Sequence, residues 1–320
     1  MSGSSAAPAD IQTRSTQGVL ESLLLALRDI KLAHSVFALP FALLGAFLAT
    51  PVLRGGDDAS WATLAWQLGL IVVCMVLART WAMLFNRLVD ARFDRENPRT
   101  AGRAFASGRV SLARGWIIAS ISAACFVVAC AGFYLIDKNV WPIALSLPTL
   151  GWVALYSLTK RFTSLSHLFL GGALAASPIA AALAIDPAFL WSHAVVWWLA
   201  LMVVFWVGGF DVLYALQDEQ FDRERGLRSI PSRFGASGGV WLSRLMHLVC
   251  WGALVMSWRT DDRLGVVFAL SVVLVGVLLL CEHAVLQRRG LAGLPVVFFL
   301  INGIVSCVVG TLGIMDLFVQ

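Results

Sequence analysis

The chain has 320 residues, of which 59% are hydrophobic and only 13% are charged, and its formal net charge is +5. Soluble globular proteins carry about 25% charged residues, so this composition and a mean hydropathy of +0.81 exclude an ordinary soluble domain. Apolar runs of about 20 residues instead predict an all-α, polytopic membrane protein embedded in the lipid bilayer. The basic residues lie in the loops between these runs, which favours a topological role over nucleic-acid binding.

The first segment of the chain differs from the rest. Residues 1–24 are predicted to be a disordered cytosolic tail, because they begin with a polar, Ser- and Ala-rich stretch without the apolar segment of a signal peptide. Residues 25–320 are predicted to form one helical membrane domain. The nine candidate spans of this domain are 34–53, 63–86, 112–136, 140–158, 165–185, 194–216, 239–258, 264–285 and 292–316.

Basic residues gather in every second loop. On one side of the predicted bundle they are Arg14, Arg28, Lys31, Arg87, Arg92, Arg95, Arg99, Arg103, Arg109, Arg114, Lys160, Arg161, Arg223, Arg225, Arg228, Arg233, Arg244, Arg288 and Arg289. On the other side they are Arg54, Lys138, Arg259 and Arg263. Because cytosolic loops carry the excess of lysine and arginine, the N-terminus is predicted to be cytosolic and the C-terminus external. The expected location is the inner (cytoplasmic) cell membrane.

Two polar stretches end the second and sixth predicted spans and run into the loops that follow, both on the cytosolic side. The first contains three residues at four-residue spacing: Asn86, Asp90 and Asp94. The second contains Asp211, Tyr214, Asp218 and Asp222. On a helix, these spacings would stack the acidic side chains of each stretch on one face. Like charges repel and charge near lipid is costly, so the pattern indicates that a divalent cation compensates the carboxylates.

Mg²⁺ is the cation that best fits this pattern, because it prefers oxygen ligands and commonly combines one or two carboxylates with substrate phosphate oxygens. Two facing clusters could hold two ions with a diphosphate between them. Basic residues of the same loops would complete this clamp: Arg99, Arg103, Lys160, Arg161, Arg223 and Arg228. Such a clamp stabilises a diphosphate as its carbon–oxygen bond breaks, and the apolar bundle would house a long prenyl chain.

The motifs also support a resemblance to a known family. The first stretch, read as NxxxDxxxD, and the second, read as DxxYxxxDxxxD, resemble the two aspartate-rich motifs of the UbiA superfamily of membrane prenyltransferases. Residues 156–161 resemble its Tyr-x-x-x-Lys-Arg element, and the likeness extends over residues 25–316. It implies Mg²⁺-dependent transfer of a polyprenyl group from its diphosphate to an acceptor, commonly an aromatic ring. Arg87 departs from the many members that have an aspartate there, which weakens a ligand role at that position.

The resemblance implies a role for each matching residue. The metal ligands would be Asn86, Asp90, Asp94, Asp218 and Asp222. The catalytic residues would be Asp90, Asp218, Asp211 and Tyr214, the last two orienting the acceptor or stabilising an allylic cation. Lys160 would bind diphosphate, with Arg99, Arg161 and Arg223 as further predicted contacts.

Three other arginines are candidate substrate-binding residues. Arg28 lies before the first predicted span, where it could pair with an acceptor carboxylate or serve as a topology signal. Arg79 lies inside the second span, seven residues before Asn86, where it could face the pocket or form a structural pair. Arg233, in the loop after the second motif, is predicted to reach phosphate.

Three local sequences resemble the quinone-pathway branch of the family: residues 86–90, 214–218 and 229–235. That branch includes 4-hydroxybenzoate polyprenyltransferases of ubiquinone synthesis. It also includes the enzymes that prenylate 1,4-dihydroxy-6-naphthoate on the futalosine route to menaquinone. The residues around both motifs resemble this second group in particular. Both acceptors are hydroxylated aromatic acids; we take 4-hydroxybenzoate as the first prediction and dihydroxynaphthoate as the alternative. A transporter is a remote alternative, because the polar sites of transporters lie near the bilayer midplane, whereas the acidic stretches of this chain are predicted at the cytosolic ends of the helices.

Overall fold

A computed structural model of the protein describes residues 37–55 and 60–319. Every regular element in these two ranges is helical, which confirms the prediction of an all-α protein. The predicted tail, residues 1–24, lies outside the described residues, as does the beginning of the first predicted span.

Seven helices of the described ranges are long and apolar enough to cross a membrane. They are α3 (Trp61–Val89), α5 (Leu112–Asp137), α8 (Ser166–Ile185), α10 (Val195–Ala215), α12 (Ile230–Arg259), α13 (Val266–Arg289) and α14 (Asn302–Val319). The multi-pass membrane character of the chain is therefore confirmed. The predicted number of nine spans is not confirmed, because two of the nine stretches form shorter helices.

The two shorter stretches are the first and the fourth. α2 (Leu39–Ala49) is apolar but has only 11 residues. The fourth stretch divides into α6 (Trp141–Ala144) and α7 (Ser146–Thr159), with Leu145 between them. Pro148 lies in the first turn of α7, where its missing N–H would have had no helical acceptor. The proline therefore favours a new helix start over one continuous span.

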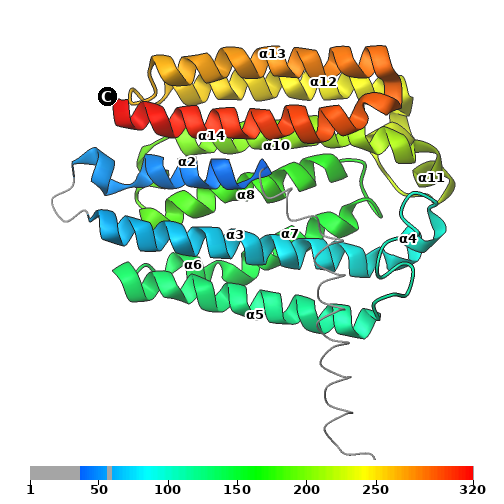
Figure 1. Cartoon of the computed structure of the whole chain (residues 1–320), viewed down its shortest axis with the longest axis horizontal. Coiled ribbons are helices and arrows are strands. Elements are labelled where there is room, and N and C mark those ends of the chain that lie inside the picture. Colours follow the sequence, from blue (N-terminus) through cyan, green and yellow to red (C-terminus); the bar gives the residue numbers. More distant parts are fainter. Residues whose placement is uncertain (1–36, 56–59, 320) are drawn as a thin grey trace, which may run out of the picture.

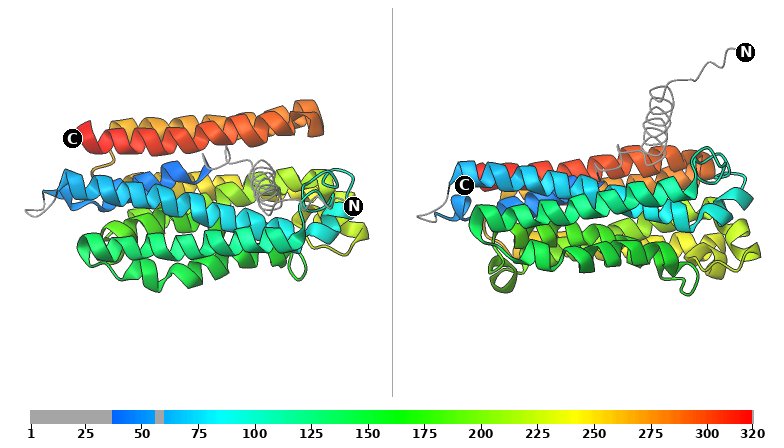
Figure 2. Two further views of the ribbon diagram at one scale, coloured as in Figure 1. Left: turned by 60° about the horizontal axis from the view of Figure 1, so that its bottom comes forward. Right: turned by 90° about the horizontal axis from the view of Figure 1, so that it is seen from below.

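Short helical elements connect the long helices. They are η2 (Pro51–Arg54), α4 (Ala91–Glu96), α9 (Phe189–Ser192), η3 (Leu216–Asp218), α11 (Glu219–Glu224), η4 (Gly290–Gly293) and η5 (Val296–Ile301). The long helices lie side by side, and α4 and α11 lie together at one end of the bundle, at the right of Figure 1. The other two views show the same arrangement, with the C-terminus at the opposite end (Figure 2). The two acidic stretches, which these short helices continue, therefore meet at one end.

α10 is the most enclosed of the long helices. It packs between α8 and α12, and its residues Leu199, Met202 and Trp206 are fully buried. Its contact with α8 is close, because a Cβ atom on Gly171 would lie 2.2 Å from the Val204 carbonyl oxygen. Small residues permit such close helix contacts in membranes. This packing fixes the end of α10, which carries the second acidic stretch, against the start of α8.

A buried hydrogen bond joins α10 to α14. The Trp206 indole N–H donates to the Asn302 side-chain oxygen over 2.6 Å, and the Asn302 amide donates to the Val297 carbonyl oxygen over 2.9 Å. Trp206 and Asn302 are both fully buried. Because lipid offers no replacement partner for the indole N–H, this bond holds the two helices together.

Asn302→Leu is expected to lower the free energy of unfolding by about 0.6–1.7 kcal/mol, the usual range for an interhelical hydrogen bond in a membrane. Reversible unfolding in detergent measures the change. Ile304→Val serves as the control, because Ile304 lies on the exposed face of the same helix. Equal changes in the two variants would show that the bond to Trp206 contributes nothing.

Candidate active site

The first acidic stretch continues α3 beyond its end. The backbone N–H of Asp90 donates to the Asn86 carbonyl oxygen over 3.1 Å, and the N–H of Asp94 donates to the Asp90 carbonyl oxygen over 2.8 Å. These two bonds carry the helical spacing from α3 into α4. As the four-residue spacing predicts, Asn86, Asp90 and Asp94 all line the same cavity.

The second acidic stretch continues α10 in the same way. Asp211 and Tyr214 lie in the last two turns of α10, Asp218 ends η3, and Asp222 lies in α11. Asp218 and Asp222 are buried, with 8% and 3% of their surface exposed. Buried carboxylates need a compensating charge or hydrogen bonds, so the surroundings of these two residues indicate how the site is used.

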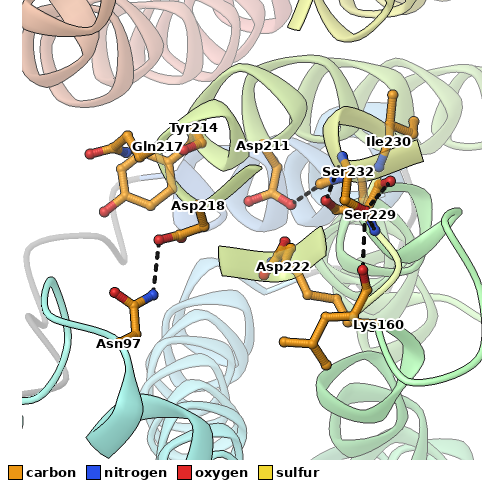
Figure 3. A network of polar contacts seen from close by, with 12 residues as sticks. Asn97, Lys160, Asp211, Tyr214, Gln217, Asp218, Asp222, Ser229, Ile230 and Ser232 are labelled. Atoms are coloured by element: carbon orange, nitrogen blue, oxygen red, sulfur yellow. Dashed lines mark hydrogen bonds and ion pairs between the residues drawn. The ribbon is translucent and has the colours of Figure 1, made fainter. Parts of the chain in front are cut away.

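A cavity of about 300 Å³ lies between the two stretches. Its polar wall includes Asn86, Asp90, Asp94, Asn97, Arg99, Arg103, Lys160, Arg161, Asp211, Tyr214, Asp218 and Asp222. Its apolar wall includes Phe37, Met83, Leu170, Leu174, Val207, Phe210 and Phe298. Figure 3 shows the acidic side chains of the second stretch together, with Asn97 and Lys160 below them in the view. Both predicted stretches therefore contribute to one site with a charged end and an apolar end.

Each of the four aspartates predicted to bind metal has a cationic partner. The ion pairs are Asp90–Arg161 at 3.1 Å, Asp94–Arg103 at 2.6 Å, Asp222–Lys160 at 3.5 Å, and Asp218–Arg99. The cations offset the repulsion between neighbouring carboxylates. They also concentrate positive charge on the wall where an anionic substrate group would lie.

Asn97 is a member of this wall that the motifs did not reveal. Its side-chain amide donates to Asp218 Oδ1 over 3.1 Å, and its side-chain oxygen accepts the backbone N–H of Arg99. Arg99 in turn donates from Nε to Asp218 Oδ1 over 2.9 Å, and its guanidinium lies over the Tyr214 ring. Asn97 therefore orients both partners of the Arg99–Asp218 ion pair.

The charged groups shift each other's protonation. Burial disfavours the ammonium form of Lys160, but the carboxylates of Asp222, Asp211, Asp218 and Asp90 together raise the pKa of Lys160 above its ordinary value. Lys160 is therefore an ammonium ion at neutral pH. Burial raises the pKa of Asp90, and the Arg161 guanidinium offsets this effect only in part. An additional cation beside Asp90 would favour its ionised form.

His167 is a second site residue that the sequence did not reveal. Its Nδ1 lies 2.7 Å from Asp211 Oδ2, and its side chain is fully buried. A single histidine in an apolar run carries no spacing signal, and its partner lies 44 residues further along the chain.

Three predicted contacts to diphosphate are not brought to the cavity. Arg223, Arg228 and Arg233 are not among the described residues that line it. Arg228 donates to the Phe162 carbonyl oxygen over 2.7 Å. Arg223 has 60% of its side chain exposed and pairs with Glu219, one turn earlier. Arg233 donates to the Ser164 hydroxyl over 3.4 Å. Their contact with substrate stays a prediction, and Arg28 lies outside the described residues.

The oxygen-rich wall fits Mg²⁺ when substrate supplies part of its coordination. No three His, Cys, Asp or Glu side chains within residues 37–55 and 60–319 lie close enough to hold an ion by themselves. Mg²⁺ commonly takes one or two carboxylates and completes its shell with phosphate oxygens and water. Asp222 Oδ2 is buried and accepts no hydrogen bond, and its ion-pair partner, the Lys160 ammonium, lies 3.5 Å away, so a metal ion would compete with Lys160 for this oxygen.

The chain is similar to proteins of one family. A model of the UbiA prenyltransferase family matches residues 38–304. A 4-hydroxybenzoate octaprenyltransferase from Hahella chejuensis is 27% identical over 224 residues, which cover 70% of this chain and 71% of that protein. The 4-hydroxybenzoate octaprenyltransferase from Methylobacillus flagellatus is 32% identical over 200 residues, which cover 60% of this chain and 63% of that protein. The Methylobacillus match therefore covers less than two thirds of that relative.

Solved structures give the same result for the fold. The apo structure of a UbiA homolog from Aeropyrum pernix K1 has a TM-score of 0.76 and 28% sequence identity, and the match covers 89% of this chain and 98% of that one. A UbiA homolog from Archaeoglobus fulgidus, bound to GPP and Mg²⁺, has a TM-score of 0.67 at 16% identity, covering 92% and 99% of the two chains. At that identity the second likeness concerns the fold alone.

Proposed function

Since the chain belongs to the UbiA prenyltransferase family, we propose that it transfers a polyprenyl group from its diphosphate to the ring of 4-hydroxybenzoate, with Mg²⁺, in quinone biosynthesis. The match to the family model confirms the family that was predicted from the two acidic motifs. The relatives named 4-hydroxybenzoate octaprenyltransferase support this choice of acceptor. The observation that carries the proposal is that both acidic stretches line one cavity whose other end is apolar.

The charged end of the cavity is the proposed diphosphate site. Mg²⁺ would be held by Asn86, Asp90, Asp94, Asp218 and Asp222. When bound, Mg²⁺ would supply charge neutralisation for the departing diphosphate. Carboxylate oxygens and one amide oxygen form the kind of hard donor set that this ion prefers.

The four ion pairs suggest how the cationic residues take part. A carboxylate that binds a metal ion interacts less strongly with its arginine or lysine partner, because the two cations compete for the same oxygens. Lys160, Arg161 and Arg99 would then direct N–H groups to the diphosphate oxygens. Their positive charge favours the leaving group over the intact substrate, since negative charge grows on the diphosphate as the carbon–oxygen bond breaks.

The apolar end of the cavity is the proposed site for the first prenyl units. Phe210 and Phe298 form part of this wall, and Phe298 lies against the Tyr214 ring with 4.4 Å between ring centroids. Aromatic faces attract positive charge and exclude water, so an allylic cation formed here would react with the acceptor ring. The electron-rich ring carbon beside the phenol would form the new carbon–carbon bond, and the ring would then lose a proton.

Arg79 is the proposed partner of the acceptor carboxylate. It lines the cavity from the middle of α3, and its Nε is buried without a hydrogen bond. Within the described residues, no carboxylate forms an ion pair with Arg79. A partly buried guanidinium of this kind would gain a charge-assisted contact from an aromatic acid.

Arg79→Met is expected to raise the KM for 4-hydroxybenzoate roughly 10- to 100-fold, the cost of losing one charge-assisted contact, with little change in the KM for prenyl diphosphate. Steady-state kinetics with each substrate varied in turn measures both constants. A neutral acceptor, 4-hydroxybenzamide, provides the control, because the unaltered protein should prefer the acid and the variant should not. An unchanged preference for the acid in Arg79→Met would exclude this role.

The orientation in the membrane is also part of the proposal. Residues 25–320 would form one domain in the inner cell membrane, with nine spans, a cytosolic N-terminus after the 1–24 tail, and the site facing the cytosol. The basic loops beside both acidic stretches support this orientation, because cytosolic loops carry the excess of positive charge. α2 would contribute as a short span within the bundle, and α6 with α7 as a broken one.

The choice of acceptor can be tested with the purified protein in lipid nanodiscs. Mg²⁺ and a radiolabelled polyprenyl diphosphate are supplied with 4-hydroxybenzoate, with 1,4-dihydroxy-6-naphthoate, or without an acceptor. Labelled 3-polyprenyl-4-hydroxybenzoate is the expected product. A product formed only with dihydroxynaphthoate would contradict the proposed acceptor and retain the reaction class. In proteoliposomes supplied with the same label, labelled lipid crossing the vesicle membrane without any product would instead support transport.

A further inference from the structure

His167 links three helices at the edge of the site. It is the second residue of α8 and is fully buried. Its Nδ1 lies 2.7 Å from Asp211 Oδ2 in α10, and its Nε2 accepts the backbone N–H of Ile230, the first residue of α12, over 3.2 Å. Asp211 lines the cavity, and 20% of its side chain is exposed. Figure 3 shows Asp211 beside Ile230 and above Asp222 in the view.

The two hydrogen bonds determine where the imidazole proton lies. A backbone N–H can only donate, so Nε2 must be the acceptor and carries no proton. The ring proton therefore lies on Nδ1, which donates to Asp211. A second proton on Nε2 would break the bond to Ile230 and leave two buried N–H groups facing each other, which is costly. His167 is thus held as one neutral tautomer.

A neutral partner distinguishes Asp211 from the other acidic residues of the cavity. Asp90, Asp94, Asp218 and Asp222 each form an ion pair with an arginine or a lysine. Within the described part of the chain, the only side chain paired with Asp211 in this way is His167. The imidazole fixes the carboxylate by a hydrogen bond without cancelling its charge.

The position of Asp211 indicates what this charge acts on. Asp211 precedes Asp218 by seven residues, which corresponds to about 10 Å along a helix. It therefore lies deeper along its own helix than the proposed metal ligands Asp218 and Asp222. There the carbon–oxygen bond of the prenyl diphosphate would break, its electron pair leaving with the diphosphate and positive charge developing on the allylic carbon. A fixed carboxylate aimed at developing positive charge lowers the energy of the transition state.

We propose that His167 is a positioning residue for prenyl transfer, which holds the Asp211 carboxylate in place through its neutral Nδ1–H. The inference rests on the proposed function, because it assigns Asp211 to the positive charge of that reaction. It adds a residue that neither acidic motif contains.

Two substitutions separate the two hydrogen bonds of His167. The amide nitrogen of asparagine occupies the place of Nδ1, so His167→Asn keeps a donor for Asp211 and loses the acceptor for Ile230. The amide of glutamine reaches the place of Nε2, so His167→Gln keeps an acceptor for the Ile230 N–H and loses the donor to Asp211. Activity and thermal stability are measured for both variants.

We expect one variant to lose activity while keeping its stability, and the other to lose stability while keeping its activity. His167→Gln should unfold near the temperature of the unaltered protein but show a kcat roughly 10- to 100-fold lower, as is typical when a supporting hydrogen bond is lost. Its KM for prenyl diphosphate should stay within about 3-fold, because the diphosphate wall is a separate set of residues. His167→Asn should unfold at a lower temperature yet keep a kcat within about 5-fold of the unaltered protein. If kcat fell only in the variant with the lower unfolding temperature, His167 would have a structural role alone, and the inference would be wrong.

A double-mutant cycle and a spectrum complete the test. In the Asp211→Asn background, His167→Gln should lower kcat by less than about 3-fold, since the carboxylate that it positions is gone; a full additional loss would overturn the inference. The ¹⁵N spectrum of histidine-labelled protein should contain a neutral Nδ1–H ring signal that His167→Gln removes. A protonated or Nε2–H ring would contradict the inference independently of activity. Absence of any transfer by the unaltered protein would instead contradict the proposed function.

Discussion

Asp90→Asn and Asp218→Asn are each expected to lower kcat/KM for prenyl transfer roughly 10³-fold or more. Each substitution removes one negative charge from the wall proposed to hold Mg²⁺ and preserves the size of the side chain. The remaining amide oxygen is a weaker ligand for a hard cation, so neutralisation of the leaving group is lost where it matters most. The double variant should lose little more than either single one, because residues acting as one unit are not additive.

The control for these variants is Asp186→Asn. Asp186 lies beyond the end of α8, at the opposite end of the bundle, and pairs with Arg54. The substitution is chemically identical but distant from the cavity, so transfer should stay within about 3-fold of the unaltered rate. Steady-state assays over a range of Mg²⁺ concentrations provide the measurement. Undiminished transfer by Asp90→Asn and Asp218→Asn would remove both residues from the site.

Lys160→Met is expected to raise the KM for prenyl diphosphate roughly 10- to 150-fold, which corresponds to the loss of one charge-assisted hydrogen bond of about 1.5–3 kcal/mol. Lys160 is surrounded by carboxylates, and its ammonium lies 3.5 Å from Asp222 Oδ2. Its removal leaves the wall more negative. Binding of Mg²⁺ alone should therefore be unchanged or tighter, whereas binding of the diphosphate should weaken.

Because Lys160→Met should affect the affinities for Mg²⁺ and for diphosphate differently, the experiment distinguishes a lost phosphate contact from general damage to the site. Isothermal titration gives the affinity for Mg²⁺ without substrate, and kinetics give the KM for prenyl diphosphate. Lys138→Met is the matched control, because Lys138 caps the end of α5 at the opposite side of the bundle and should change neither quantity. Parallel weakening of Mg²⁺ and diphosphate binding in Lys160→Met would point to a local structural defect in place of a lost phosphate contact.

The sequence predicts the local geometry of the site well. The four-residue spacing of Asn86, Asp90 and Asp94 places them on one wall because helical hydrogen bonds continue across the junction of α3 and α4. Charge in alternate loops predicts that both acidic stretches lie at the same end of the bundle, and α4 and α11 do lie together there (Figure 1). The shared wall depends on helical periodicity, and the shared end of the bundle depends on how often the chain crosses it. Both can be read directly from the sequence.

Pairings between distant segments are less accessible from the sequence. Many basic residues were available in the loops, and the spacing alone does not select Arg99 for Asp218 or Arg103 for Asp94. Arg223 shows a local alternative, since the four-residue interval from Glu219 already favours a helical ion pair between them. His167 has no periodic partner at all, and only packing of α8 against α10 brings it to Asp211.

The number of membrane-spanning helices is also only partly predictable from the sequence. Hydropathy predicts apolar stretches, but helix length depends on where prolines and caps divide them. Pro148 lies in the first turn of α7, within the fourth apolar stretch, so an apolar run of suitable length forms two helices. Near a protein-lined cavity, such breaks are tolerated because neighbouring helices can satisfy the freed backbone groups.

The stoichiometry of the reaction tests the account most directly. The purified protein in nanodiscs is supplied with Mg²⁺, a polyprenyl diphosphate and 4-hydroxybenzoate, and both products are quantified in the same sample. One inorganic diphosphate is expected for each prenylated ring, with neither product formed when Mg²⁺ or the aromatic acid is omitted. Release of diphosphate at the same rate without an acceptor, or no prenylated ring in the complete mixture, would contradict the proposed reaction.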